Sequence, residues 1–385
     1  MAKKPFLVVS YSIPNRASGT PVVIRNFLEN FECDEVVLMG RPVLKTERVN
    51  NIQFQYPIYK IPVPPVGFRG ERLWRFLSVI MGVFTGLYAV RVHNIKALLV
   101  FYRDQSSLFT GYILHKLTKL PLHAYFCDIY LENYPKGFDN SLAKWLQPRI
   151  FKNASRVFVL TEAMKEYFEN QYGLRPVVLP HCINDANITT QNFSMASPPL
   201  KIGYLGIVNI DRLPSLKVLC EAIGGDDQFE IDYFTPSPTE LLKNEGLLVP
   251  NSKCRFIPSN EKLMEELSKC DILFLPVMIS TKHKERELQG VTGFPTKTLE
   301  YLVCQKPILV HSEKHYFVSR FFEEYHCGYC VNGGAGEIRS ALLRLQDNSH
   351  LRENLSKNTI AALRYFDGKT IANHFRQEIS IYEKK

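Results

Sequence analysis

Strand-like and helix-like segments alternate along almost the whole chain, and this alternation limits the fold more than any other feature. Apolar runs of strand length recur in the first half at 5–12, 35–40, 52–58, 97–103, 122–128, 156–160 and 176–181. A second series follows at 201–206, 229–235, 254–258, 271–277, 307–312 and 328–332. Helical patterns separate most of these runs, so the sequence predicts an α/β protein with parallel sheets.

A polar stretch divides the two series. Residues 182–199 carry Ser, Asn, Thr and Pro in place of an apolar pattern, which is typical of a linker. A chain of 385 residues is also long for a single core. We therefore expect four parts, which are a first domain over 1–185, a linker over 186–199, a second domain over 200–368 and a final helix over 369–385 that could pack back toward the first domain.

Composition narrows the function classes. Apolar residues make up 45% and charged residues 22%, as in ordinary globular proteins. Nine cysteines are scattered without a disulfide framework, and the start of the chain reads as a strand and not as a secretory signal, so we expect a cytoplasmic protein. The net charge is +9 without a basic tail, which favours anionic small molecules or a membrane surface over nucleic acid.

The segment "GVTGFPTKTLEYLVCQKPILV", residues 290–310, has the pattern of a loop, a helix and a strand. Gly290 and Gly293 allow a sharp turn and a close approach to a ligand. Glu300 falls in the first helical turn, where a carboxylate could accept hydrogen bonds from a sugar diol. A favourable acid at a helix start explains Glu300 equally well.

Three motifs resemble those of GT-B glycosyltransferases of the GT4-like group. They are "RVFVLTEAMKEYFENQYGLRPVVLPHCIN" at 156–184, "IGYLGIVNIDRL" at 202–213 and "FPTKTLEYLVCQKPILV" at 294–310. The resemblance implies two Rossmann-like doubly wound domains that face each other across a cleft. It also implies transfer of a sugar from a nucleotide-diphosphate donor, bound by the second domain, to an acceptor on the first.

The same resemblance assigns donor-side residues. Glu300 matches the family's ribose-binding glutamate, but Thr292 stands where a first glutamate is common. Glu285 or Glu287 could replace it, and backbone N–H groups of Thr292, Gly293 and Phe294, beside Pro295, could bind donor hydroxyls or phosphate. On sequence alone, a glutamate at position 292 should be tolerated.

Positive charge is expected at the donor diphosphate. The chain has no Asp-x-Asp motif, so the resemblance implies a metal-independent enzyme without a cofactor. Gly206 belongs to the glycine loop, and Arg212 and Lys217 have the spacing of the family's phosphate-binding pair, although a solvated helix start would also explain them. Lys297 is a further candidate for this role.

The first domain should hold the acceptor. Gly19 and Thr20 correspond to the family's Gly-Gly pair at the start of the first helix, although a simple turn would also suit. Asp128 follows a predicted strand and could orient or deprotonate the acceptor hydroxyl, or else cap a helix. Arg103 follows the neighbouring strand.

Residues 73–90 form the most apolar stretch of the chain, with Arg75 inside it. A bilayer needs about 20 residues, so this stretch is marginal as a span. We expect a buried or half-buried helix, and the alternative is a helix lying on the anionic inner face of a membrane.

Together with these features, the resemblance implies a retaining, metal-independent glycosyltransferase of EC class 2.4 that binds a nucleotide sugar and a glycan or lipid-linked glycan acceptor. Two alternatives remain open. A catalytically silent binding or partner subunit is favoured by Thr292, and a sugar-nucleotide epimerase would need an acid–base set that the sequence does not display.

Overall fold

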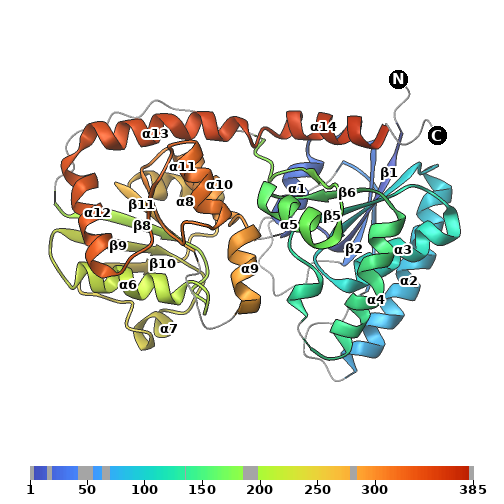
Figure 1. The fold of residues 1–385 in the computed structure, drawn as a ribbon, viewed down its shortest axis with the longest axis horizontal. Helices are drawn as coiled ribbons and strands as arrows, with labels where there is room; N and C mark the ends of the chain where they lie inside the picture. Colours follow the sequence, from blue (N-terminus) through green and yellow to red (C-terminus); the bar gives the residue numbers. More distant parts are fainter. Residues whose placement is uncertain are drawn as a thin grey trace. The chain divides into compact units, whose positions relative to one another are not determined.

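The computed structural model describes residues 4–14, 20–41, 55–62, 70–134, 136–184, 198–277 and 284–380 (Figure 1). The chain divides into two compact units. Unit 1 comprises Met1–Asn184 and Asp367–Lys385, and unit 2 comprises Asp185–Phe366. The C-terminal helix therefore belongs to the same unit as the N-terminal half.

Unit 1 contains a seven-stranded sheet with the order β3-β2-β1-β4-β5-β6-β7, in which neighbouring strands are parallel. Its strands are β1 (Phe6–Ser12), β2 (Val36–Arg41), β3 (Ile58–Lys60), β4 (Ala97–Tyr102), β5 (Leu122–Phe126), β6 (Ala154–Val159) and β7 (Val177–Val178). Its helices are α1 (Thr20–Leu28), α2 (Glu71–Val92), α3 (Gln105–Thr118), η1 (Leu131–Asn133), α4 (Phe138–Asn153), α5 (Glu162–Tyr172) and α14 (Gly368–Ser380).

The C-terminal helix α14 packs with α1 and β6 in unit 1. Phe375 contacts the rings of Phe6, Phe27 and Phe31 and is fully buried. Two ion pairs flank this aromatic cluster, Arg376 with Glu35 at 2.9 Å and Arg156 with Glu378 at 2.7 Å. Buried aromatic area makes α14 part of the unit 1 core.

Unit 2 contains a six-stranded sheet with the order β10-β9-β8-β11-β12-β13, again with parallel pairings. Its strands are β8 (Leu200–Leu205), β9 (Phe229–Phe234), β10 (Ser252–Arg255), β11 (Ile272–Pro276), β12 (Ile308–His311) and β13 (Tyr329–Val331). Its helices are α6 (Leu213–Ile223), α7 (Thr239–Asn244), α8 (Asn260–Ser268), α9 (Lys284–Thr292), α10 (Lys297–Cys304), α11 (Phe317–Glu324), α12 (Ala335–Asp347) and α13 (Ser349–Arg364).

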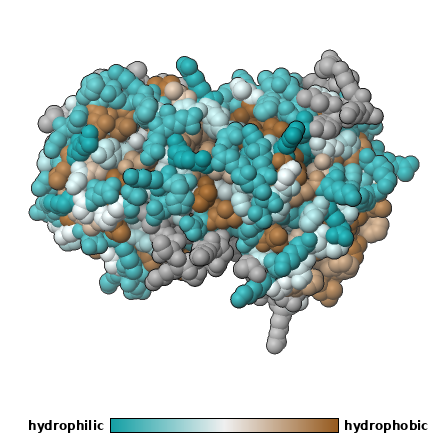
Figure 2. Space-filling view, viewed as in Figure 1, coloured by the Kyte–Doolittle hydropathy of each residue, from teal (hydrophilic) through white to brown (hydrophobic). Residues whose placement is uncertain are grey.

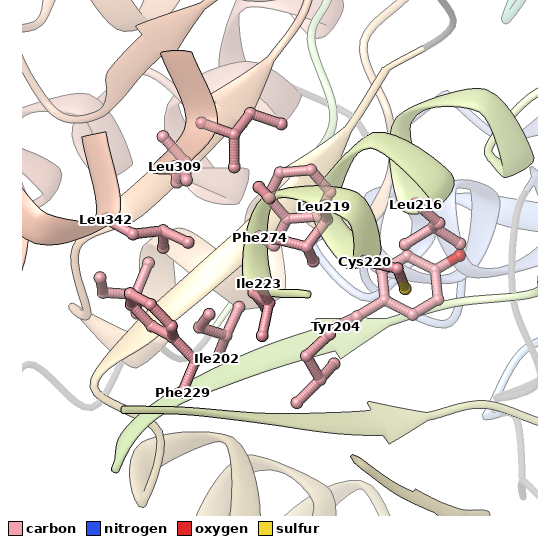
Figure 3. Packing of buried hydrophobic residues seen from close by; sticks show 14 of the residues in the cluster. Ile202, Tyr204, Leu216, Leu219, Cys220, Ile223, Phe229, Phe274, Leu309 and Leu342 are labelled. Atoms are coloured by element: carbon pink, nitrogen blue, oxygen red, sulfur yellow. The ribbon is translucent and has the colours of Figure 1, made fainter. Parts of the chain in front are cut away.

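The core of unit 2 lies between its sheet and the helices α6 and α12. Figure 3 shows Leu216, Leu219 and Ile223 of α6 beside the strand residues Ile202 and Phe274. These α6 positions are three or four residues apart and form one buried face, as expected for an amphipathic helix. The packing fixes the start of α6 against the carboxyl ends of β8 and β11.

The predicted fold class is confirmed, because both sheets are parallel and helices alternate with strands. One detail differs from the sequence-based expectations. Residues 290–292, expected as the start of a loop, are the end of helix α9. The final helix, expected over 369–385, begins at Gly368 as α14, where Asp367 caps it by accepting hydrogen bonds from the Thr370 backbone N–H and hydroxyl.

Candidate functional site

The carboxyl ends of β8 and β11 lie at the point where the strand order of unit 2 reverses. From β8 the chain continues to β9 and β10 on one side, and β11, β12 and β13 follow on the other. Open α/β sheets bind ligands at this switch point, because the loops that leave the two strands diverge there. We therefore expect a ligand of unit 2 to bind at this edge of its sheet.

Gly206 follows β8 directly and has a φ of 144°. A side chain would be strained there, so the glycine is required by the backbone conformation. The nearby Tyr204 hydroxyl donates to the Ile207 carbonyl at 2.9 Å, and burial raises the pKa of Tyr204 to about 12. The loop after β8 is thus held by backbone geometry and a side-chain hydrogen bond.

Tyr301 joins the two diverging strands. The strands β8 and β11 pair as far as Gly203 and Leu273. Beyond that point the Tyr301 hydroxyl accepts from the Leu205 N–H at 2.7 Å and donates to the Phe274 carbonyl at 3.0 Å. The side chain is fully buried, which raises its pKa well above the usual value. Tyr301 therefore fixes α10 beside the end of β8.

Arg212 lies at the start of α6, on the same edge. Its Nη1 donates to the carbonyl of Pro276, the last residue of β11, at 2.7 Å. Burial lowers the pKa of this guanidinium, but an arginine remains charged at neutral pH. A half-buried cation beside two strand ends is suited to an anionic ligand.

Lys217 lies one turn further along α6 and points elsewhere. Its Nζ is 2.9 Å from Glu245 Oε2, and its side chain is half exposed. Arg212 and Lys217 therefore contact different partners in this structure, although their five-residue spacing suggested a phosphate-binding pair.

Thr292, the last residue of α9, is fully buried. Its hydroxyl donates to the Leu288 carbonyl at 2.7 Å. Gly293 follows, and its N–H donates to the Gln289 carbonyl at 2.8 Å. A Cβ on Gly293 would overlap that same carbonyl oxygen, which explains the glycine. Both residues thus terminate α9, and the Gly293 N–H donates its hydrogen bond to the last turn of this helix.

Phe294 and Pro295 connect α9 to α10. The Phe294 ring packs on Phe321 at 5.0 Å and on Phe366 at 5.4 Å, so its side chain belongs to an aromatic cluster. The Pro295 carbonyl accepts from the Thr298 N–H at 2.9 Å and forms the first turn of α10. These contacts hold the loop rigidly against unit 2.

Lys297 and Glu300 occupy the first turn of α10, with Lys297 Nζ 3.3 Å from Glu300 Oε1. About a quarter of each side chain is exposed. Because Tyr301 is bonded to the end of β8, its neighbour Glu300 is held near the switch point. An accessible carboxylate and ammonium at one helix start can bind hydroxyl and phosphate groups together.

In unit 1, Asp128 and Arg103 follow the adjacent strands β5 and β4, which pair up to Tyr102 and Phe126. The Asp128 carboxylate accepts from the Ile129 N–H at 2.9 Å. Burial raises the pKa of Asp128 to about 6, and hydrogen bonds and the charge of Arg103 oppose this rise. Arg103 itself is exposed.

The acceptor loop is described only in part. Gly19 and the side chain of Thr20 lie outside the described residues, and so do the side chain of Glu285 and the linker at 185–197. Thr20 is the first residue of α1. Glu287 lies in α9, with its Oε1 3.7 Å from His315 Nε2.

The sequence-based predictions did not include a second polar site that the structure shows in unit 1 around Arg41. Arg41, at the end of β2, is buried with its guanidinium 4.8 Å from the Tyr11 ring centre. It lines a hollow of about 20 Å³ together with Ser10, Ser78 and Thr110. The sequence signal that could have indicated this site is Arg41 itself, a basic residue directly after the apolar run 35–40. Among the described residues, no three His, Cys, Asp or Glu side chains gather as a metal site.

Comparison with known proteins supports the fold. No protein-family model and no curated protein matches the sequence. Among solved structures, a sucrose-phosphate synthase from Thermosynechococcus elongatus is similar over 100% of both chains, with 13% identity and a TM-score of 0.71. Anabaena HepE in complex with UDP is similar over 98% of this chain and 99% of its own, with 15% identity and a TM-score of 0.70.

A glycosyltransferase from Rickettsia africae is also similar, over 100% of this chain and 99% of its own, with 13% identity and a TM-score of 0.66. These likenesses extend over both units and are not limited to one Rossmann-like half. This chain has the GT-B fold, as these glycosyltransferases do.

Proposed function

We propose that the protein is a glycosyltransferase that uses a nucleotide-diphosphate sugar. The observation that carries the proposal is the edge of unit 2, where Arg212 contacts the end of β11 and Tyr301 holds Glu300 beside the end of β8. The switch point thus carries a cation for phosphate and a carboxylate for a ribose diol. HepE, which has the same fold, was solved with UDP and with UDP-glucose.

In the proposed reaction, the bond between the sugar C1 and the diphosphate oxygen breaks, and the acceptor hydroxyl oxygen bonds to C1. Arg212 and Lys297 would stabilise the charge on the departing diphosphate, so that no metal is needed. Asp128 of unit 1 would orient the acceptor hydroxyl, whose proton passes to the departing phosphate. Attack from the face that the diphosphate leaves makes the enzyme retaining.

The acceptor in this proposal is a glycan or a lipid-linked glycan, and the site of action is the cytoplasm. The acidic Asp128 and the exposed Arg103 at neighbouring strand ends support a hydroxyl-rich acceptor, because carboxylates and guanidinium groups hydrogen-bond sugar hydroxyls.

Calorimetric titration with UDP, GDP and ADP tests the donor site. We expect Glu300→Gln to weaken the binding of the preferred nucleotide at least tenfold, because hydrogen bonds to a charged group contribute about 1.5–3 kcal/mol. Glu353→Gln is the matched control, since Glu353 is a half-exposed glutamate of α13 paired only with Lys357 in the described contacts. Equal affinity in folded wild type and Glu300→Gln would reject the ribose assignment.

A silent nucleotide-binding subunit is the second candidate. It is favoured by Thr292, whose buried hydroxyl is bonded to Leu288 and cannot act as a carboxylate. Such a protein would bind a nucleotide and release no product from any nucleotide sugar, with or without an acceptor. Turnover by the wild-type protein distinguishes the two candidates.

A further inference from the structure

Helix α2 exposes a continuous apolar stripe. Its residues at intervals of three or four are solvent-exposed, with Leu73 at 64% and Phe84 at 70% of full exposure. The stripe consists of Leu73, Phe76, Leu77, Ile80, Phe84 and Tyr88. Figure 2 shows hydrophobic surface at the lower right, where α2 lies in Figure 1. Soluble proteins rarely leave such a large apolar stripe exposed without a partner.

The opposite side of α2 is packed tightly on α3. A Cβ at Gly86 would lie 2.5 Å from Leu114 Cδ1, and one at Gly82 would lie 3.1 Å from Thr110 Cγ2. The Ser78 hydroxyl also donates to the Pro62 carbonyl at 2.6 Å. Small residues on this side therefore allow a close helix–helix contact.

This packing decides between two roles for the helix. Leu73–Val92 is long and apolar enough to cross a membrane, and 33% of its most apolar window is buried in the protein. A spanning helix would have to leave α3 and expose Leu114 and Thr110. A helix fixed to its unit by one face and apolar on the other is instead suited to lie in the plane of an interface.

Basic side chains accompany the apolar stripe. The helix α3 contacts both α2 and α4, so the three helices form one layer on the sheet of unit 1. Helix α3 has no Asp or Glu, and α4 has only Asp139, against Lys144, Arg149 and Lys152. The exposed Trp145 of α4 carries the Arg149 guanidinium 4.2 Å from its ring centre. Exposed cationic side chains complement the negative charge of an anionic lipid surface, and the aromatic ring beside them can enter the headgroup region.

The first turns of α2 and α4 lie close together. Arg75 Nη1 of α2 is 4.0 Å from Asp139 Oδ1 of α4. The exposed Leu73 and Phe138 are in these same turns, on the edge of the sheet where β5 ends and Asp128 follows. If the first turns of α2 and α4 contacted a membrane, the carboxyl end of β5, which Asp128 follows, would lie near the lipid headgroups.

We propose that the layer of α2, α3 and α4 is a docking surface for an anionic membrane, with the apolar stripe of α2 in the headgroup region and the cations of α4 beside it. The inference rests on the exposed face of unit 1. It does not rest on the proposed transfer reaction, so vesicle binding and nucleotide binding are separate measurements.

Flotation of the full-length protein with vesicles tests the proposal. We expect binding to mixed phosphatidylglycerol and phosphatidylcholine vesicles, little binding to phosphatidylcholine alone, and release at high salt. Phe84→Glu should weaken binding at least tenfold, because a large apolar side chain leaves the interface. Lys144→Gln and Arg149→Gln should each weaken it about fivefold, as expected for one cation near an anionic surface.

Two control variants lie in unit 2. Phe256→Glu changes another exposed aromatic residue, and Lys357→Gln another exposed cation; neither should alter flotation. Leu73→Glu provides a second test if Phe84→Glu does not fold. Absence of flotation, equal binding to both vesicle types, or release only by detergent would overturn the proposal. A dimer in light scattering that Phe84→Glu dissociates, with no vesicle binding, would assign the stripe to a second copy instead.

Discussion

Removing the hydroxyl of Tyr301 should loosen the switch point of unit 2. In Tyr301→Phe the Leu205 N–H and the Phe274 carbonyl both lose the partner that joins β8 to β11. Both residues are buried, so water cannot easily replace the hydroxyl. A buried polar group that loses its partner costs about 1–3 kcal/mol, so for the two groups we expect a loss of about 2–6 kcal/mol in the free energy of unfolding.

Urea titration followed by circular dichroism measures this change. In a domain of this size, about 2–6 kcal/mol also corresponds to a fall in Tm of roughly 4–24 °C. Tyr329→Phe is the control, because the Tyr329 hydroxyl accepts one longer hydrogen bond, 3.2 Å from Arg344 Nη1, in an exposed setting. It should change the unfolding free energy by less than about 0.5 kcal/mol.

The same variant tests the link between this hydrogen bond and the donor site. Since Tyr301 fixes the first turn of α10, Tyr301→Phe should also weaken nucleotide binding, although Tyr301 itself is buried. If Tyr301→Phe unfolds at the same urea concentration as wild type, the hydroxyl does not connect the two strands as described, and the reasoning is refuted.

Three further outcomes follow from the structure. Thr292→Glu should lower the unfolding free energy by about 1–3 kcal/mol, because the site is fully buried, whereas Thr292→Val should cost about 1 kcal/mol; equal urea midpoints for wild type and Thr292→Glu would contradict this. Asp128 has a pKa of about 6 when folded, above its ordinary value, so its ionisation should reduce stability by about 2–3 kcal/mol as pH rises from 4 to 7, and Asp128→Asn should remove that loss in pH-dependent urea titrations. Lys217→Ala should slow donor turnover less than Arg212→Ala, because Lys217 is paired with Glu245; a larger effect of Lys217→Ala in steady-state assays would reverse their roles.

The alternation of elements could be predicted from sequence because the central strands of both sheets are apolar runs that are buried on both faces. The runs around Val36–Arg41, Ala97–Tyr102 and Ile272–Pro276 are buried along their whole length. Helix α5 (Glu162–Tyr172) lies between the predicted strand runs 156–160 and 176–181, and local signals set its bounds, because Thr161 caps its start and Gly173 ends it in a left-handed conformation. Local chemistry was sufficient for these elements.

The contacts of the candidate site depend on partners that are distant in sequence. Lys217 bonds to Glu245 and Tyr301 to Leu205, and no local pattern indicates either pair. The burial of Thr292 also changes the expectation that a glutamate would be tolerated there, because burial depends on how α9 packs in unit 2. Strand ends could be located from sequence, but the direction of each side chain could not.

Release of nucleoside diphosphate from UDP- and GDP-sugars, measured in EDTA with and without glycan acceptors, tests the proposed function most directly. The account predicts that wild-type protein turns over at least one donor without metal and that Arg212→Ala lowers kcat by about 10²–10³. Failure to release product from any donor, activity that EDTA abolishes and magnesium restores, or an Arg212→Ala enzyme as fast as wild type would contradict it.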